Sequence, residues 1–247
     1  MIRLLLIILF IIVSCTDNST NLGKQVDASN FLPLDIGNYW IYEFSELDIS
    51  NQLTGEKHID SVLITGSKKI NGENFYTVVT FRSNEAIDTS YWNADNNSIF
   101  KFANAKDVNI PGFSNTIFKM VELFKSDWFI FDYLQDSLLV DFVGEKHLFV
   151  GEFNFHGYRN YGDDTIYINN QEYVTMAIKI VQDAKYTEKN SSNTVYLHNQ
   201  PTYYYYKEDI GLVLIRKESN FIVEQGNINN KIWFNGWQRQ LIRYHLR

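Results

Sequence analysis

The stretch NYWIYEFSE, residues 38–46, decides the fold class of this 247-residue chain. Its aromatic residues Trp40, Tyr42 and Phe44 alternate with other side chains. In an extended strand, successive side chains point to opposite faces, so these three rings share one face. The stretch is therefore predicted to be a strand with an aromatic face against a core.

The same period of two recurs along most of the chain after Asn30. Phe75, Thr77, Val79 and Phe81 are predicted to share one face of the strand that follows Asn71-Gly72. Asn-Gly, Asn-Asn and Asp-Asn pairs separate such segments, and these residues tolerate the positive φ of tight hairpins. Further strands are predicted at 61–65, 91–92, 99–102, 165–168, 173–181, 202–206, 212–216, 221–224 and 232–234. The chain is thus predicted to be all-β, an antiparallel up-and-down curved sheet or barrel of lipocalin-like or lipoprotein-carrier-like form.

Residues 114–125 interrupt this pattern. Ile117, Met120, Val121 and Phe124 fall at the i, i+3, i+4 and i+7 spacing of one helix face. One short helix is expected there.

Two segments of the chain resemble each other. Residues 70–75, INGENF, match residues 168–173, INNQEY, and a strand is predicted after each. Two duplicated meanders are one interpretation, and chance similarity between two hairpins is the other. Either way the meanders would unite in one sheet, because a lone small meander leaves a face uncovered.

The N-terminus has the features of a bacterial lipoprotein leader. After Arg3, residues 4–13 form an apolar run of ten residues, about 15 Å as a helix and half of the roughly 30 Å hydrocarbon core. The run ends in Ile12-Val13-Ser14-Cys15, which resembles a lipobox, and Cys15 is the only cysteine of the chain. Residues 1–14 are therefore predicted to be a signal peptide, and Cys15 the lipidation site. An ordinary secretory leader with an incidental cysteine is the alternative.

The rest of the chain is expected to be held at a membrane by this lipid. Residues 15–30 are polar and read as a flexible tether of roughly 20–25 Å, and residues 31–247 as a single β-rich domain. The net charge of −7 argues against nucleic-acid binding. The expected location is the bacterial cell envelope, on the outer membrane and facing the periplasm or the cell surface. Protein partners are not indicated.

A family resemblance rests on two motifs. Residues 31–42, FLPLDIGNYWIY, resemble the PLxxGNxWxY opening of uncharacterised bacterial envelope lipoproteins, and residues 204–213, YYYKEDIGLV, resemble their aromatic strand and GLV turn. These proteins often carry a strand–turn–strand element, here residues 165–180, although this chain has Gln171-Glu172 where a glycine usually precedes the aromatic residue. The resemblance implies a β-rich envelope protein and no particular activity.

Catalytic and metal-binding motifs are missing from the sequence. There is no Gly-x-Ser-x-Gly elbow, His-Glu-x-x-His or phosphate-binding loop, and the five histidines are dispersed. Residues 93–98 have some calcium-loop character, but a hairpin turn is favoured because the glycine and the closing glutamate are missing. The protein is predicted to be no enzyme and to use no cofactor or metal. The alternative is an envelope glycan or lipid hydrolase with an unidentified carboxylate pair.

The abundance of aromatic residues suggests where a ligand would bind. Exposed Tyr and Trp rings could stack on sugars, whereas inward rings could line an apolar pocket. Thr77, Val79 and Ala177 are expected to face inward and leave room. The predicted function is non-catalytic: binding a hydrophobic or glycan ligand, or a structural role in the envelope. The candidate ligand-facing or core aromatics are Trp40, Tyr42, Trp92, Tyr204 and Tyr206.

Overall fold

The structure is a computed structural model that describes residues 26–103, 113, 115–142, 145–160, 162–189, 195–224 and 227–247. Side chains are described in these ranges except at 138–142, 145–147, 195–197, 222–224 and 227–232. The predicted signal peptide, the predicted lipidation site Cys15 and most of the predicted tether lie outside the described residues. The elements are the 3₁₀-helix η1 (Ala28–Phe31) and the strands β1 (Tyr39–Leu47), β2 (Leu53–Ile70), β3 (Glu73–Arg82), β4 (Glu85–Ala94), β5 (Ser98–Ala103), β6 (Thr116–Glu122), β7 (Asp127–Phe142), β8 (Glu145–Arg159), β9 (Asp164–Ile168), β10 (Gln171–Glu188), β11 (Val195–Lys207), β12 (Gly211–Lys217), β13 (Asn220–Glu224), β14 (Asn227–Phe234) and β15 (Gly236–His245).

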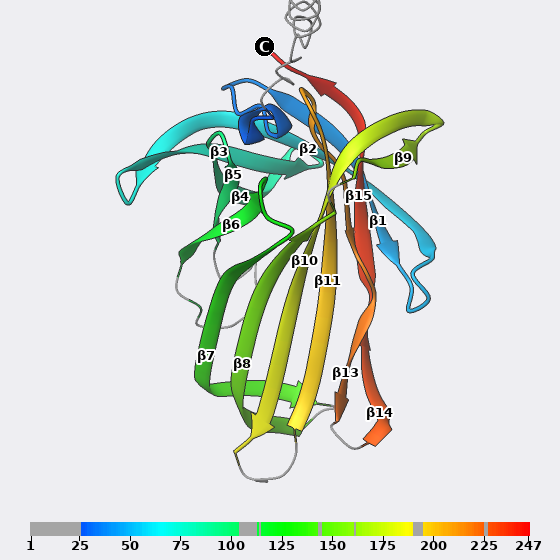
Figure 1. The fold of residues 1–247 in the computed structure, drawn as a ribbon. Helices are drawn as coiled ribbons and strands as arrows, with labels where there is room; N and C mark the ends of the chain where they lie inside the picture. Colours follow the sequence, from blue (N-terminus) through cyan, green and yellow to red (C-terminus); the bar gives the residue numbers. More distant parts are fainter. Residues whose placement is uncertain are drawn as a thin grey trace, which may run out of the picture.

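The described strands form one antiparallel sheet, which confirms the predicted fold class. Hydrogen-bonded neighbours follow the order β6-β5-β4-β3-β2-β1-β15-β12-β11-β10-β8-β7, and β9, β13 and β14 pair at its margins. Strand β15 pairs with both β1 and β12, so the end of the chain joins the first six strands to the later ones. The sheet curls into a nearly closed barrel, with the long strands β7, β8, β10 and β11 forming one wall (Figure 1).

Side chains bridge the seam between β6 and β7, the two ends of the strand order. Trp128 at the start of β7 donates a hydrogen bond from Nε1 to the carbonyl oxygen of Lys119 on β6, at 2.9 Å. The Arg159 guanidinium donates to the carbonyl oxygen of Leu123, just after β6. The Trp128 ring lies over Gly157, where an added Cβ would come within 2.1 Å of the ring. Gly157 therefore allows this indole to cross the seam.

The helix expected at residues 114–125 is wrong, because the structure has strand β6 there. Phe118 and Met120, two residues apart, are buried on the barrel side. The ladder between β5 and β6 provides hydrogen-bond partners for the backbone of this segment. Over so few residues, the spacing of the apolar side chains fits a strand as well as a helix. Tertiary pairing thus overrides a weak helical signal.

The two matching segments form the same kind of turn. Asn71 and Gly72 have φ of 52° and 89°, and Asn169 and Asn170 have φ of 50° and 65°. Two successive positive φ values in a two-residue loop correspond to a type I′ hairpin turn. Ile70 and Ile168 close their hairpins by pairing with Glu73 and Gln171. A second asparagine therefore does in the later hairpin what glycine does in the earlier one.

The expected inward direction of Thr77, Val79 and Ala177 is wrong. In β3, Val78 and Thr80 line the interior instead. In β10, the buried residues are Met176 and Ile178, on either side of Ala177. Val78 pairs with Ile64 beyond an irregularity of the β2–β3 ladder at residues 64–66. Because side chains alternate, a change of phase by one residue exchanges the two faces of a strand.

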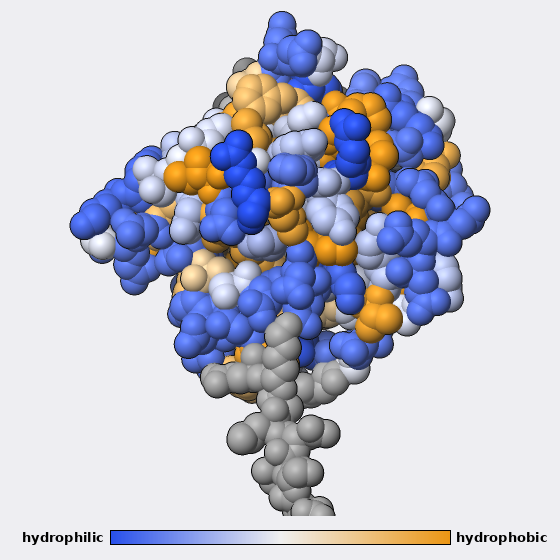
Figure 2. Space-filling view, turned by 90° about the horizontal axis from the view of Figure 1, so that it is seen from above, coloured by the Kyte–Doolittle hydropathy of each residue, from blue (hydrophilic) through white to orange (hydrophobic). Residues whose placement is uncertain are grey.

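Helix η1 and the segment after it cover the upper end of the barrel. Asp27 caps the helix by accepting a hydrogen bond from the Ser29 amide at 2.8 Å. The Ala28 amide donates to the Asn96 carbonyl oxygen at 3.0 Å, and the Asn30 carbonyl oxygen accepts from the Asp209 amide at 2.8 Å. Seen from this end, apolar patches lie between hydrophilic side chains (Figure 2). Among the described residues, no helix has the length and apolar character needed to cross a membrane.

Candidate functional site

A cavity of about 350 Å³ lies inside the barrel. Its size is at the lower end of the roughly 300–1,000 Å³ of small-molecule sites. Strands from both halves of the sheet contribute to its wall, together with the segment after η1. The lining residues are Leu32, Leu34, Trp40, Tyr42, Val62, Ile64, Val78, Thr80, Asp88, Ser90, Trp92, Lys101, Met120, Tyr204, Tyr206, Leu212, Ile215, Lys217, Trp237 and Arg239.

The five aromatic residues singled out in the sequence all line this cavity. Trp40 and Tyr42 come from β1, Trp92 from β4, and Tyr204 and Tyr206 from β11. Within β1 and within β11 the period of two places both rings on the interior face. The curl of the sheet then brings the three strands around one space.

Hydrogen bonds to the backbone hold the two β1 aromatics in place. Trp40 donates from Nε1 to the Ile210 carbonyl oxygen at 2.7 Å, and Tyr42 donates from its hydroxyl to the Leu212 carbonyl oxygen at 2.8 Å. Between these acceptors lies Gly211, with φ of 100°. The polar ends of both rings are therefore satisfied within the protein, and burial raises the pKa of the Tyr42 hydroxyl well above its usual range. Both side chains act as scaffold while they line the cavity.

Two buried polar atoms in the lining have no hydrogen-bond partner among the described residues. They are the hydroxyl of Tyr206, a fully buried residue, and Nε of Arg239. Burial raises the pKa of Tyr206 well above its usual value, so the phenol stays protonated and can donate. An unpartnered buried donor costs free energy unless a water or a ligand satisfies it.

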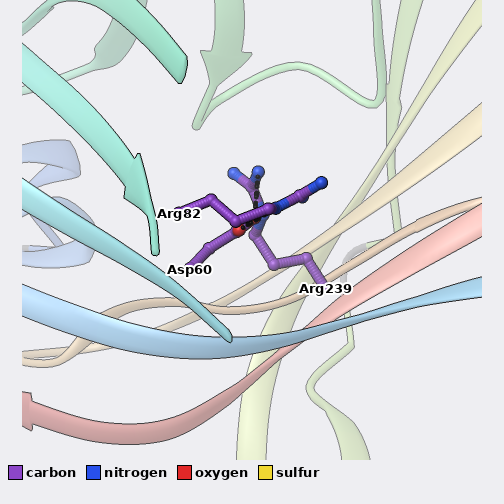
Figure 3. Close-up of polar contacts among 3 residues, drawn as sticks. All are labelled: Asp60, Arg82 and Arg239. Atoms are coloured by element: carbon purple, nitrogen blue, oxygen red, sulfur yellow. Dashed lines mark hydrogen bonds and ion pairs between the residues drawn. The ribbon is translucent and has the colours of Figure 1, made fainter. Parts of the chain in front are cut away.

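A buried carboxylate links three strands beside this cavity (Figure 3). Asp60 on β2 has a fully buried side chain. Its Oδ1 accepts from Arg82 Nε on β3 at 2.8 Å, and its Oδ2 accepts from Arg239 Nη2 on β15 at 2.8 Å. Arg82 Nη2 adds a second contact to Oδ2 at 3.2 Å. Both carboxylate oxygens are thus occupied by guanidinium groups.

Sequence reasoning missed this triad, although a signal for it existed. Asp60 has the same strand phase as Val62 and Ile64, which line the cavity. A carboxylate in the inward phase of a strand needs a partner. Arg82 is the residue directly opposite Asp60 in the β2–β3 hairpin, so this partner is local. Arg239 is 179 residues away in sequence, so this partner depends on the tertiary fold.

The floor of the cavity is polar and continues into a second cavity of about 80 Å³. Lys101, Met120, Tyr204 and Lys217 line both spaces. Burial lowers the pKa of Lys217. Among the described residues, no carboxylate lies within ion-pair distance of its ammonium group. The second cavity is otherwise lined by Ala103, Phe118, Phe155, Ile180, Gln182, Gln200 and Thr202.

His198 is a neighbouring titratable group on β11. Burial and, to a lesser degree, the charge of Lys217 lower its pKa to about 4, while Asp183 acts in the opposite direction. The imidazole is therefore neutral at neutral pH. Its Nε2 is buried and has no hydrogen-bond partner in the described part of the chain.

Metal-ligand clusters do not occur in the described part of the chain: no three His, Cys, Asp or Glu side chains there are placed to hold a metal ion. The segment with calcium-loop character, residues 93–98, comprises the end of β4, the turn and the first residue of β5. Asp95 Oδ1 accepts from the amides of Asn97 and Ser98 at 2.8 and 2.7 Å. This carboxylate therefore stabilises the hairpin, as the sequence favoured.

Comparison with known proteins gives only distant likenesses. No family model and no curated protein matches the chain. A crystal structure of a predicted lipoprotein from Parabacteroides distasonis is similar with a TM-score of 0.47 and 10% identity, over 87% of this chain and 98% of that one. A predicted exported protein with a YmcC-like fold from Bacteroides fragilis is similar with a TM-score of 0.39 and 8% identity, over 86% and 97%. The function of this chain has to be inferred from its own residues.

Proposed function

We propose that the protein is a lipid-anchored, non-catalytic component of the bacterial cell envelope that binds a hydrophobic ligand inside its barrel. The observation that carries the ligand proposal is the internal cavity of about 350 Å³ with aromatic and aliphatic walls. Binding in such a space removes apolar ligand surface from water, at roughly 25 cal/mol for each Å².

The character of the wall favours a hydrophobic ligand over a glycan. Trp40 and Tyr42 use their polar atoms on the protein backbone, so they offer ring surface to a ligand. A sugar would need many hydrogen-bonding groups in addition to stacking rings. The hydrolase alternative is not favoured either. Among the described residues, two carboxylates lie in or against the cavity, and one of them, Asp60, is engaged by two arginines.

Quenching of tryptophan fluorescence tests the ligand proposal. Trp40, Trp92 and Trp237 line the cavity, so a bromine-labelled decanol that enters it should quench their emission. The full lipidated chain, kept soluble by an amphipathic polymer too large for the cavity, should show saturable quenching. Val78→Phe fills the cavity and should abolish it, whereas the matched control Val79→Phe changes the other face of β3 and should retain it. Absence of saturable quenching, or equal quenching in both variants, would contradict the proposal.

The anchor part of the proposal rests on the N-terminal sequence. Cys15 follows an apolar run and a lipobox-like Ile12-Val13-Ser14. Attachment of acyl chains there would give stable anchoring, since more than one chain exceeds the threshold for reversible binding.

Substitution of Cys15 tests this anchor. Cys15→Ala should leave the full-length precursor unprocessed, because the thiol receives the lipid that precedes cleavage. Metabolic labelling with a fatty-acid probe, followed by gel mobility, measures both properties. Undiminished label on the variant would rule out Cys15 as the lipidation site.

A further inference from the structure

We infer that the ligand of the cavity is a single-chain amphiphile with an anionic headgroup, and that the headgroup binds at the polar floor beside Lys217. The inference rests on the proposed function and specifies the class of ligand. Three features of the described residues support it: the charge of the cavity, an unpartnered donor near its floor and its shape.

The charge around the cavity is opposite to that of the whole chain. The chain carries a net charge of −7, yet among the described residues positive side chains outnumber negative ones in and against the cavity. The positive ones include Lys217, Arg239 and Arg82, and the negative ones are Asp60 and Asp88. An anion is therefore favoured there and a cation disfavoured.

Lys217 is the centre of this positive region. Arg82 and Arg239 share the carboxylate of Asp60, but no described carboxylate pairs with Lys217. Lys217 is partly buried, and an ammonium group that is partly removed from water without a counter-ion is destabilised, so a partner that brings a negative charge is favoured there. Lys217 lines both the main cavity and the smaller one, so a bound anion at this position would contact it directly.

An unpartnered donor provides an independent indication of a ligand. Nε of Arg239, a cavity-lining residue, is buried and finds no acceptor among the described residues. Arg239 pairs with Ile215, two residues before Lys217 on β12, whereas Tyr206 pairs with Leu212, nearer the covered end. The Arg239 donor therefore suits a headgroup at the floor that supplies acceptor oxygens.

The distribution of apolar and polar side chains sets the direction of the ligand. Leu32 and Leu34, from the segment after η1, line the cavity at its covered end. Lys217, Gln182 and Gln200 line the smaller cavity of about 80 Å³ at the floor. The headgroup would therefore lie at the floor and the chain would extend toward the covered end. The two volumes leave room for one chain and not for a two-chain phospholipid.

A series of probes with one chain length and different headgroups tests the inference. In the fluorescence assay, decanoate and decyl phosphate should displace bromine-labelled decanol at concentrations at least about tenfold lower than unlabelled decanol, because a charge-assisted hydrogen bond adds affinity. Decylamine should be the weakest competitor. Inorganic phosphate alone should not displace the probe, which separates an amphiphile site from a site for a free anion. The order of decanoate and decyl phosphate identifies the headgroup.

Substitution of Lys217 completes the test. Lys217→Gln should reduce the affinity for decanoate to about the affinity for decanol, and should leave decanol binding unchanged. Lys217→Arg should restore the preference for decanoate over decanol. Lys185→Gln, which removes a half-exposed lysine of the outer surface, is the matched control and should bind as the unchanged protein does. If Lys217→Gln fails to fold, the probe series with the unchanged protein still decides.

The outcomes separate the inference from the proposed function. Equal binding of decanoate, decyl phosphate and decanol would overturn the inference and leave the proposed function in place. Displacement by inorganic phosphate alone would also overturn it. Lack of binding by every probe would overturn both.

Discussion

At the scale of single residues, a buried carboxylate and two arginines connect three strands of this barrel. Asp60 has no exposed side-chain surface, whereas Arg82 and Arg239 are 30% and 21% exposed. Two partly solvated cations thus stabilise one buried anion, and they tie β2 to β3 and β15. Breaking such a group is costly because the remaining charges keep part of their desolvation penalty.

Removal of the Asp60 charge should therefore destabilise the protein. Asp60→Asn should lower the free energy of unfolding by about 3 kcal/mol, at the low end for a buried ion pair because both arginines reach solvent. Urea unfolding measures the change. Glu152→Gln, which breaks a half-exposed pair with Lys185, is the control and should cost under about 1 kcal/mol. Equal effects of both variants would contradict the structural role of Asp60.

Trp40 should also be a major contributor to stability. It is 4% exposed and donates to the Ile210 carbonyl oxygen, so Trp40→Ala should cost about 3–5 kcal/mol. Trp40→Phe, which keeps a ring and loses the donor, should cost about 1–3 kcal/mol. Urea melts measure both values. An unchanged midpoint for Trp40→Ala would mean that this residue serves ligand binding and not the scaffold.

At the scale of elements, side chains close the barrel between β6 and β7, which share no hydrogen-bond ladder in the described part of the chain. Strands β6 and β7 follow one another in the chain, yet it is the Trp128 indole that spans them. This arrangement requires a residue without a side chain on the neighbouring strand β8, and Gly157, paired with Trp128 in the ladder, provides it.

A methyl group at Gly157 should therefore open the seam. Gly157→Ala would place Cβ within 2.1 Å of the Trp128 ring, and the forced shift should cost about 1–3 kcal/mol. Near-ultraviolet circular dichroism and urea unfolding should both report it. Gly66→Ala, at a position with no atom within 4 Å of the added Cβ, is the control and should be close to neutral. A neutral Gly157→Ala would mean that the indole can move without loss.

At the scale of the whole molecule, burial of His198 links folding to pH. Its pKa is lowered to about 4 in the folded protein, while the unfolded chain has the ordinary value near 6.5. Between these values the unfolded state binds more protons than the folded state. Stability is therefore fully present above about pH 6.5 and declines as the pH falls toward 4.

The size of this effect follows from the displacement of the pKa. Between pH 7 and 5 the His198 contribution should fall by about 2 kcal/mol. His198→Gln should remove that part of the decline, because glutamine does not titrate. Urea unfolding at both pH values, with and without the substitution, measures the difference. The same decline in both proteins would assign it to other groups.

Local sequence determined the fold class, the position of most strands and five aromatic residues of the cavity, although Trp237, which also lines it, was not among the candidates. A period of two needs only neighbours in the chain, and Trp40 and Tyr42 carry it within five residues. The type I′ turns at Asn71 and Asn169 are equally local, because φ depends on the residue itself.

The tertiary structure alone decided three other features. Strand β6 replaced a helix because its ladder with β5 outweighed a weak periodicity. The inward phase of β3 was set by its register with β2, so Val78 lines the cavity where Val79 was expected. The Asp60–Arg239 pair joins residues 179 positions apart. Each depends on contacts between distant segments, which a local pattern does not specify and which form only when the sheet closes.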